Sequence, residues 1–312
     1  RLLQLGAISR SKRIIPTAIE FVDIAGLVKG ASEGAGLGNK FLAHIREVDA
    51  IVQVIRAFRD DNIIHVLSRV DPKNDADIVD LELVLADGQT IAKRLETAKK
   101  SAKGSAWKEL EAQISWLERL NTHLQTGRPA RELEYSEAEM KLMKELPLLS
   151  AKPMLYVVNT DEPGANIEPS AQVHLASSRS QIFVCAKLEA ELADLSPEDA
   201  RAYMKELGMT ETGLDKLIVA GYKLLDLVTF FTSGEPETRA WTVRRGTKGP
   251  EAAGVIHTDF IKGYIKADVV NWKDFVDSNG WVGVKEKGEM RLEGKEYVVA
   301  DGDVCYFHIS SF

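Results

Sequence analysis

A glycine-studded segment constrains this chain more than any other stretch. An apolar run from Ala18 to Val22 leads into Asp23, five glycines follow, and a helical pattern begins at Phe41. The five are Gly26, Gly30, Gly34, Gly36 and Gly38. A carboxylate at a strand end can hold Mg²⁺ through water, and Gly26 lets its backbone N–H approach a terminal phosphate. The segment therefore predicts a phosphate-sensing switch, although a plain glycine-rich connection between a strand and a helix would carry the same residues.

The bulk composition limits the classes of protein to consider. The 312 residues suffice for two or three domains, and a net charge of -7 argues against a protein that coats nucleic acid over its whole surface. Cys185 and Cys305 are the only cysteines, so a disulfide scaffold and a cysteine-rich zinc site are excluded and a reducing compartment is expected. No apolar run reaches membrane-spanning length and no secretory signal is found, so the expected location is the cytoplasm.

The first part of the chain predicts an α/β domain. Residues from Ile14 to Val22 are expected to form a strand that ends at Asp23, and apolar spacing from Phe41 to Val48 indicates a helix. The β-branched run from Ile51 to Ile55 suits a parallel strand buried on both faces. A strand, a helix and another strand in this order make a βαβ unit, which is typical of the α/β class.

Two stretches of near-heptad spacing follow, separated by a polar break at Lys100 to Ser105. The apolar positions are Ile78, Leu81, Leu85, Ile91, Leu95 and Ala98, then Trp107, Leu110, Ile114, Leu117, Leu120 and Leu124. The pattern predicts an antiparallel helical hairpin, which serves either as a structural arm or as a partner-binding arm. Ser136 and Glu139 then suit a capping box for a short helix from Ala138 to Leu146.

The α/β pattern returns after the hairpin. The expected elements are two strands, Met154 to Val158 and Gln181 to Cys185, and a closing amphipathic helix, Leu214 to Leu225. Asn159 follows the first strand and Ala186 follows the second. Ligands of open α/β sheets bind at the carboxyl ends of the strands. We therefore expect Asp23, Asn159 and Ala186 to share one edge, which is the predicted nucleotide pocket.

From Leu227 onward the sequence predicts a small mixed-sheet module of roughly 80 residues, within the usual size of a domain. The expected strands are Val228–Thr232, Ala240–Arg244, Gly263–Ala267, Tyr297–Val299 and Val304–His308, with short helices near Ala252 and Trp272. The module carries Arg239, Arg244, Arg245, Lys262 and Lys266 among several aromatic residues. Basic and aromatic residues on one sheet can bind RNA by phosphate contact and stacking, and a solvated charged face is the alternative.

Several motifs together resemble one family. They are Phe21-Val-Asp-Ile-Ala-Gly-Leu-Val-Lys-Gly-Ala31, Gly36-Leu-Gly-Asn-Lys-Phe-Leu42, Asn62-Ile-Ile-His65, Asn159-x-x-Glu162, Arg239-Ala-Trp-Thr-Val243 and His257-Thr-Asp-Phe260. This combination closely resembles the YchF (Obg-like ATPase) family of P-loop NTPases in the translation-factor class, over essentially the whole chain. The resemblance implies a monomer that hydrolyses ATP, with GTP as the weaker ligand, uses Mg²⁺, and associates with ribosomes.

The resemblance also implies a division into domains. A P-loop NTPase G domain would occupy residues 1–74 and 147–226 and be interrupted by a helical coiled-coil insertion at residues 75–146. A TGS domain of β-grasp shape would follow at residues 227–312. Contacts with RNA or the ribosome are then expected from the TGS domain, and contacts with other proteins from the helical arm.

The turn after the strand at Met154 predicts the base that is bound. A guanine-binding Asn-Lys-x-Asp loop uses its aspartate as a two-point acceptor for guanine. Here Thr160 replaces the lysine and the longer Glu162 takes the fourth position, so ATP is the expected ligand. A shifted loop could offer Asp161 instead, and a plain polar turn is the alternative. The resemblance assigns Asn159, Thr160, Glu162, Cys185, Ala186 and Lys187 to base binding.

The position after Gly26 departs from the commoner GTPases. Leu27 stands where a glutamine would orient the attacking water, and leucine has no group that can hold water. His65 is the candidate replacement, because a neutral imidazole can accept a proton or position water. A histidine between two apolar neighbours is also found as an ordinary core or loop residue.

No Walker A loop is present in the sequence. Gly34 to Lys40 comes nearest, but Asn39 separates the glycine from the lysine and Phe41 replaces the magnesium-binding hydroxyl. The chain opens on Arg1, so the family's P-loop is expected upstream of it. We expect these 312 residues alone to bind nucleotide weakly without hydrolysing it, and the full-length protein to be an ATPase. The alternative function is an RNA- or protein-binding scaffold whose nucleotide site is regulatory or degenerate.

Overall fold

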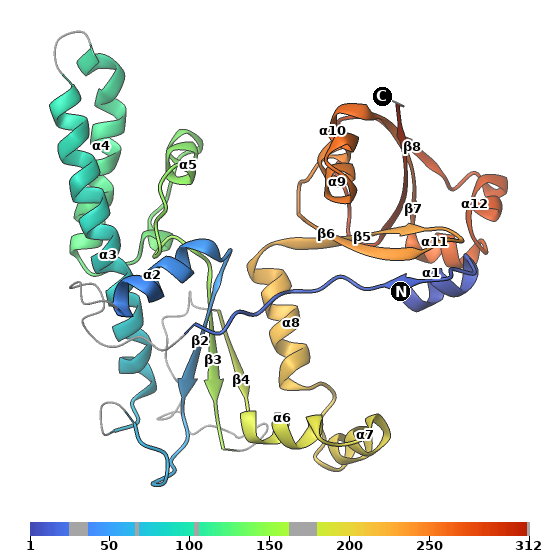
Figure 1. The fold of residues 1–312 in the computed structure, drawn as a ribbon, viewed down its shortest axis with the longest axis horizontal. Helices are drawn as coiled ribbons and strands as arrows, with labels where there is room; N and C mark the ends of the chain where they lie inside the picture. Colours follow the sequence, from blue (N-terminus) through green and yellow to red (C-terminus); the bar gives the residue numbers. More distant parts are fainter. Residues whose placement is uncertain (25–36, 66–68, 103–105, 162–179, 311–312) are drawn as a thin grey trace. The chain divides into compact units, whose positions relative to one another are not determined.

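The computed structural model describes residues 1–24, 37–65, 69–102, 106–161 and 180–310. Contacts divide the chain into two compact units, shown in Figure 1. The terminal unit comprises Arg1–Phe21 and Leu225–Phe312, and the central unit comprises Val22–Leu224. No described helix has the length and apolar character needed to cross a membrane.

The centre of the central unit is a parallel sheet with the strand order β2-β3-β4. Its strands are β2 (Ile51–Arg56), β3 (Met154–Asn159) and β4 (Ser180–Val184). The register aligns Arg56 with Asn159 and Asn159 with Val184, so the carboxyl ends of the three strands lie at one edge. Five consecutive residues of β3 are buried, as expected for a parallel strand covered on both faces. These three strands confirm the α/β prediction for this region.

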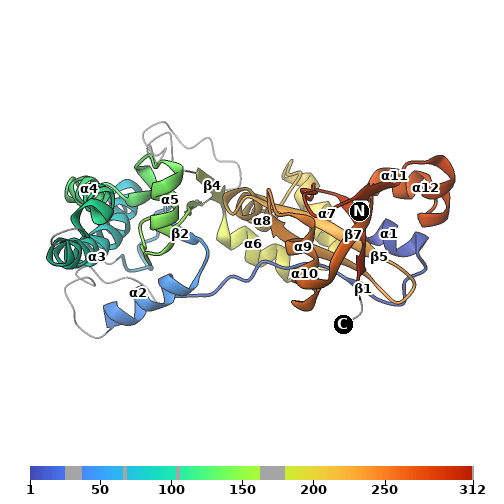
Figure 2. The same cartoon turned by 90° about the horizontal axis from the view of Figure 1, so that it is seen from above.

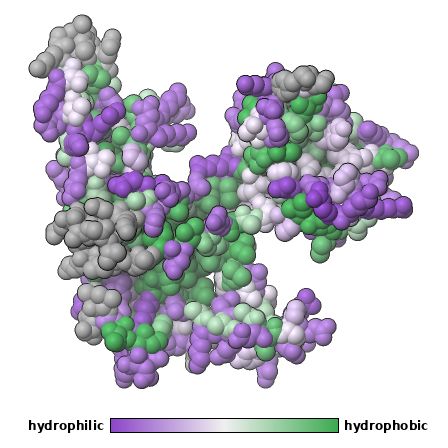
Figure 3. All heavy atoms as spheres, viewed as in Figure 1, coloured by the Kyte–Doolittle hydropathy of each residue, from purple (hydrophilic) through white to green (hydrophobic). Residues whose placement is uncertain are grey.

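The described helices of the central unit are α2 (Leu37–Glu47), α3 (Pro72–Ser101), α4 (Ala106–Gln125), α5 (Glu137–Lys144), α6 (Ala186–Ala193), α7 (Pro197–Glu206) and α8 (Gly213–Leu224). Ala76 of α3 packs against Ile55 and Tyr156, while α8 contacts β3 and β4. In Figure 3, apolar side chains remain visible over this sheet and α8. Val54 of β2 and Val219 of α8 are 67% and 66% exposed. Helices α6 and α7 were not predicted, and their apolar residues form a small separate cluster around Leu188 and Leu192.

The predicted hairpin is confirmed as α3 and α4, which lie side by side in both views (Figure 1, Figure 2). Ile91 of α3 packs with Leu117 and Leu120 of α4 in a shared apolar core. Asp71 caps α3 by accepting from the Asn74 backbone N–H at 3.1 Å. The capping box of α5 is also confirmed, since the side chains of Ser136 and Glu139 bond reciprocally to each other's backbone N–H.

The first half of α3 does not bury the predicted apolar stripe. Leu81 and Leu85 are 45% and 46% exposed, whereas Asp80 and Asp87 are 3% and 1% exposed. The reason is that this half of the helix buries other residues: Ala76 packs on the sheet, Leu83 against α2 and Val84 against α4. Only from Ile91 onward does the predicted stripe face α4.

Buried carboxylates connect this half of α3 to β3. Asp80 accepts from the Tyr156 hydroxyl at 2.6 Å and from Arg131 Nη2 at 2.5 Å. Asp87 accepts from the backbone N–H groups of Leu149 and Ser150 at 2.8 and 2.7 Å, and from the Ser150 hydroxyl at 2.6 Å. Burial raises the pKa of the Asp87 carboxyl above its ordinary value, although these hydrogen bonds oppose the rise.

The terminal unit is built on a six-stranded sheet with the order β1-β6-β5-β9-β7-β8. The strands are β1 (Ile14–Ile15), β5 (Leu227–Ser233), β6 (Thr238–Arg244), β7 (Tyr264–Asn271), β8 (Arg291–Glu293) and β9 (Asp303–Ile309). The helices are α1 (Leu2–Ile8), α9 (Gly249–Ile256), α10 (Asp259–Gly263), α11 (Trp272–Asp277) and α12 (Trp281–Lys287). One core cluster includes residues of α9, and a second includes residues of α1, α11 and α12. The predicted strand at Tyr297–Val299 is wrong, because only an isolated bridge joins Val298 to Lys248.

The amino-terminal prediction needs correction. The strand expected from Ile14 to Val22 is limited to Ile14 and Ile15, which pair in parallel with Thr238 and Arg239 of β6. Residues 16–24 form neither helix nor strand. A strand requires a neighbour to accept its backbone hydrogen bonds, and this segment finds one over only two residues. Residues 1–21 consequently belong by contact to the terminal unit, not to the region predicted for the G domain. The remaining domain boundaries stay predictions.

Candidate functional site

Asn159, the last residue of β3, lies at the carboxyl edge of the parallel sheet. Its backbone carbonyl accepts from the Ala57 N–H at 2.8 Å. Its side-chain Oδ1 accepts from the Ala186 N–H at 3.0 Å, at the start of α6. This bond fixes the orientation of the amide, because Oδ1 faces the backbone donor and the Nδ2 hydrogens point elsewhere. The edge therefore presents a donor from Asn159 in a defined direction.

The turn after Asn159 is tied to the tip of β4. The Thr160 N–H donates to the Val184 carbonyl at 2.9 Å, and the Cys185 thiol donates to the Asp161 carbonyl with Sγ and O 3.3 Å apart. Thr160 and Cys185 are both buried, so these contacts are shielded from water. Lys187 is exposed in the first turn of α6. The structure thus brings Asn159, Thr160 and the residues from Cys185 to Lys187 together, while Glu162 lies outside the described residues.

The loop after β2 joins the same edge through Arg56, which the sequence analysis missed. Its guanidinium donates to the carbonyls of Phe58, Asp60 and Ile63 at 3.1, 2.9 and 2.8 Å. It also lies over the Phe58 ring, 4.6 Å from the centroid. The available signal was a charged residue at the end of an apolar run that is only partly buried in the structure. Arg56 therefore shapes the loop that carries His65.

His65 faces the first turn of α3. Its Nε2 atom lies 2.9 Å from Asp75 Oδ2, and both side chains are largely buried. The main-chain carbonyl of Asp75 accepts from Gln53 Nε2 at 3.1 Å, which connects this turn to β2. Gly26 and Leu27, the predicted switch residues, lie outside the described residues. The water-positioning role of His65 stays a prediction.

Asp23 does not join this edge. It is exposed and lies in neither a helix nor a strand. The next residue, Ile24, packs against a cluster that contains Ile51, the first residue of β2, and Leu149, in the segment before β3. The expected convergence of Asp23 with Asn159 and Ala186 is therefore wrong in this structure. The cause is the missing strand before Asp23, which was to deliver the carboxylate to the carboxyl edge.

A magnesium ion finds no ligand set among the described residues. Groups of three or more His, Cys, Asp or Glu side chains suited to a metal are absent from the described part of the chain. Asp23, the predicted ligand through water, stands away from the carboxyl edge. No chemical step is therefore assigned to the ion.

The basic residues of the terminal unit lie on several elements. Arg245 pairs with Asp226 at 2.9 Å, and Arg239 lies 4.0 Å from the centroid of the Trp241 ring. In the strand register, Arg244 of β6 lies opposite Leu227 at the start of β5, whereas Lys266 of β7 lies opposite His308 near the end of β9. Lys262 is exposed in α10. The structure spreads the five cations over different parts of the sheet and its helices.

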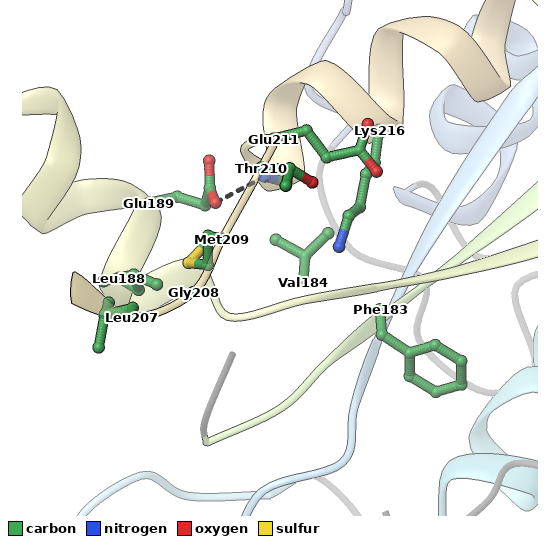
Figure 4. A pocket seen from close by; sticks show the side chains of 11 residues that line it. Phe183, Val184, Leu188, Glu189, Leu207, Gly208, Met209, Thr210, Glu211 and Lys216 are labelled. Atoms are coloured by element: carbon green, nitrogen blue, oxygen red, sulfur yellow. Dashed lines mark hydrogen bonds between the residues drawn. The ribbon is translucent and has the colours of Figure 1, made fainter. Parts of the chain in front are cut away.

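A hollow of about 220 Å³ lies beside β4, between α6, the segment before α8 and α8 itself (Figure 4). Phe183, Met209 and Lys216 are among its lining residues. Glu189 also lines it, but its carboxylate accepts from the N–H groups of Gly213 and Leu214 at 2.7 and 3.2 Å. Glu189 therefore caps α8, and the hollow lacks a set of converging reactive groups.

The fold and the edge together define a class of protein. A parallel sheet whose strand-end asparagine is bonded to the tip of the next strand fits the G domain of a P-loop NTPase, in which ligands bind at the carboxyl ends of the strands. A family model described as a 50S ribosome-binding GTPase matches residues 5–94. A second model, for the carboxy-terminal region of YchF GTPases and described as a protein of unknown function, matches residues 227–310.

Similar proteins narrow the class to a family. The chain is 48% identical over 318 residues to "Ribosome-binding ATPase YchF" of Bacillus subtilis (strain 168), covering 99% of the chain and 86% of that protein. It is 45% identical over 311 residues to the protein of the same name from Escherichia coli O157:H7, covering 98% and 85%. The solved "Structure of the Schizosaccharomyces pombe YchF GTPase" aligns with a TM-score of 0.84 at 35% identity, covering 98% of the chain and 84% of the solved one. The chain belongs to the YchF family, as its motifs indicated.

Proposed function

We propose that the protein is an ATPase that acts as a nucleotide-dependent switch on the ribosome. The observation that carries the proposal is the bond between Asn159 Oδ1 and the Ala186 N–H, which assembles a base-reading edge in a member of the YchF family. Relatives named as ribosome-binding ATPases support the activity and the partner. Function on ribosomes would place the protein in the cytoplasm.

The same edge supports a preference for ATP. The 6-oxygen of guanine needs a donor, but the Ala186 N–H at the tip already donates to Asn159. Adenine carries an amino group at that position, which is itself a donor and needs no donor from the protein. Thr160 also replaces the lysine of the guanine-binding loop. The Asn159 amide would donate from Nδ2 to the purine ring nitrogen N7, which both bases possess.

For hydrolysis, we assign His65 to the attacking water in place of the glutamine that Leu27 replaces. The histidine stands in a loop that Arg56 anchors at the carboxyl edge. Gly26 remains the proposed contact to the terminal phosphate in the nucleotide-bound protein.

The preference is tested by titrating the full-length protein with ATP and GTP and measuring turnover of each. Tighter binding and faster turnover of ATP are expected, and a clear preference for GTP would remove the assignment. A polypeptide of these 312 residues is expected to show no turnover, because it lacks a Walker A loop. Measurable hydrolysis by that polypeptide contradicts the expectation.

We further propose that the terminal unit is a TGS domain of β-grasp type that contacts the ribosome or RNA, and that the protein is a monomer. Sedimentation with ribosomes, with and without ATP, tests the switch. Association that responds to ATP supports it, whereas association indifferent to nucleotide favours the scaffold function. Charge reversal of Arg244 and of Lys266, made singly, then locates the contact, because the two residues stand near different ends of the sheet.

A further inference from the structure

A hydrogen-bonded pair joins the loop after β2 to α3. His65 Nε2 lies 2.9 Å from Asp75 Oδ2, and the two side chains are 15% and 18% exposed. An ionised carboxylate can only accept a hydrogen bond, so Nε2 carries the proton in this pair. We propose that Asp75 is the positioning residue for His65 and fixes the orientation and the tautomer of its ring. The role of the pair in hydrolysis rests on the proposed function.

Asp75 is itself held from several directions. Its main-chain carbonyl accepts from Gln53 of β2, and the N-cap bond from Asn74 to Asp71 closes the same helical turn. The next residue, Ala76, is fully buried against Ile55 and Tyr156. A carboxylate on a rigid, packed turn can impose an orientation on its partner, whereas one on a free loop would follow the partner.

The tautomer decides what the ring can do. With the proton on Nε2, the lone pair of a neutral imidazole is on Nδ1, which is the nitrogen able to accept a proton from water. An aspartate plays this orienting part toward histidine in Ser-His-Asp hydrolases, where it holds the tautomer without taking the proton. Asp75 would act in the same sense, through His65 and without touching the nucleotide.

The tautomer is read directly by ¹⁵N NMR of the His65 ring in the 312-residue chain. The wild-type ring is expected to be protonated at Nε2, and Asp75→Ala is expected to give a mixture of both tautomers. Asp77→Ala is the matched control, because Asp77 lies on the same helix and pairs with Lys73 at 2.8 Å. A ring protonated at Nδ1 in the wild type, or a tautomer unchanged in Asp75→Ala, overturns the proposal whatever the activity.

Turnover of the full-length protein tests the consequence. Asp75→Ala and Asp75→Asn are expected to lower kcat by roughly 10- to 100-fold, the range seen for lost orienting partners, with KM for ATP changed less than about 2-fold. The double variant Asp75→Ala/His65→Ala should have the same kcat as His65→Ala alone, because Asp75 acts only through His65. Asp77→Ala should keep the wild-type kcat.

The outcomes separate the proposal from the function on which it rests. A faster Asp75→Ala would mean that Asp75 restrains the histidine, which overturns the proposal and leaves the role of His65 in place. A wild-type rate in His65→Ala removes the histidine from the proposed function, and the catalytic role of Asp75 fails with it. If His65→Ala has a lowered kcat while a folded Asp75→Asn keeps the wild-type kcat, the positioning role of Asp75 is overturned and the role of His65 stands.

Discussion

Only the first half of α3 adds hydrogen bonds from buried carboxylates to its apolar contacts. Up to Asp87 the helix packs against the sheet, α2 and α4, and its buried carboxylates accept five hydrogen bonds from Arg131, Leu149, Ser150 and Tyr156. From Ile91 onward it faces α4 through apolar side chains, with a surface ion pair between Lys99 and Glu118. Hydrogen bonds fix a position and direction, whereas apolar contacts are non-directional. The first half therefore sets where the arm stands, and the second half only holds the two helices together.

The largest loss of stability is expected from Asp87→Ala. The substitution leaves two buried N–H groups and one hydroxyl without their acceptor, and each such loss costs about 1 to 3 kcal/mol. We expect a decrease of about 4 kcal/mol in the free energy of unfolding, measured in urea. Asp77→Ala, on the exposed side of the helix, should cost less than about 0.5 kcal/mol. A cost for Asp87→Ala below about 1 kcal/mol would contradict the role given to the buried carboxylate.

Leu120→Ala tests the other half. Leu120 is fully buried between the helices, and such truncations cost about 3 kcal/mol. Hydrogen exchange should accelerate in α4 and in α3 beyond Ile91, while β3 keeps its protection. Lys99→Ala, at the surface ion pair, should change the unfolding free energy by less than about 0.5 kcal/mol. Loss of protection in β3 from Leu120→Ala would show that the halves are not distinct.

Tyr156→Phe is expected to have a smaller effect at the sheet. It removes one hydroxyl that donates to Asp80 and accepts from Arg131 Nη2 at 3.1 Å, without changing the ring. The expected cost is about 1.5 kcal/mol in the same urea experiment. Faster exchange should appear in β3 and the first half of α3. Equal acceleration in α4 would contradict the comparison.

The pH dependence of stability isolates the Asp87 carboxyl. Burial raises its pKa in the folded protein above the unfolded value, so folding favours the protonated form. The resulting contribution to the free energy of unfolding is fully present below the pKa of Asp87 in the unfolded chain, near 4. It is lost as the pH rises through the higher pKa of Asp87 in the folded protein. Urea unfolding at a series of pH values should show a decline of this sign in the wild type that is absent from Asp87→Asn. Parallel curves for the two proteins would show that Asp87 does not titrate differently on folding.

The sequence predicted those elements that carry their own signal. The unbroken apolar run from Met154 to Val158 could only be a buried strand, and it is β3. The same reasoning placed Asn159 and Ala186 at strand ends, where the structure joins them. By contrast, the strand expected before Asp23 depended on a neighbour that the segment itself cannot specify. Pairing partners are properties of the whole chain, so this prediction failed.

Besides strand pairing, the periodicity of the sequence could not predict which charged residues are buried. Leu81 and Leu85 stood at heptad positions and were assigned to the hairpin seam, but they are exposed. Asp80 and Asp87 have the spacing of a solvated face, yet they are buried because Tyr156, Arg131 and Ser150 supply donors. Those donors lie 51 or more positions away in sequence, so a reading of local pattern had no access to them.

The unbroken course of α3 has a mechanical consequence. Its 30 residues span about 45 Å, from the turn that holds His65 to the far end of the arm. A stiff rod of this length works as a lever. A tilt of about 5° at the Asp75 end would carry Ser101 by roughly 3 Å, so a small rearrangement around the histidine would become a displacement large enough for another molecule to sense.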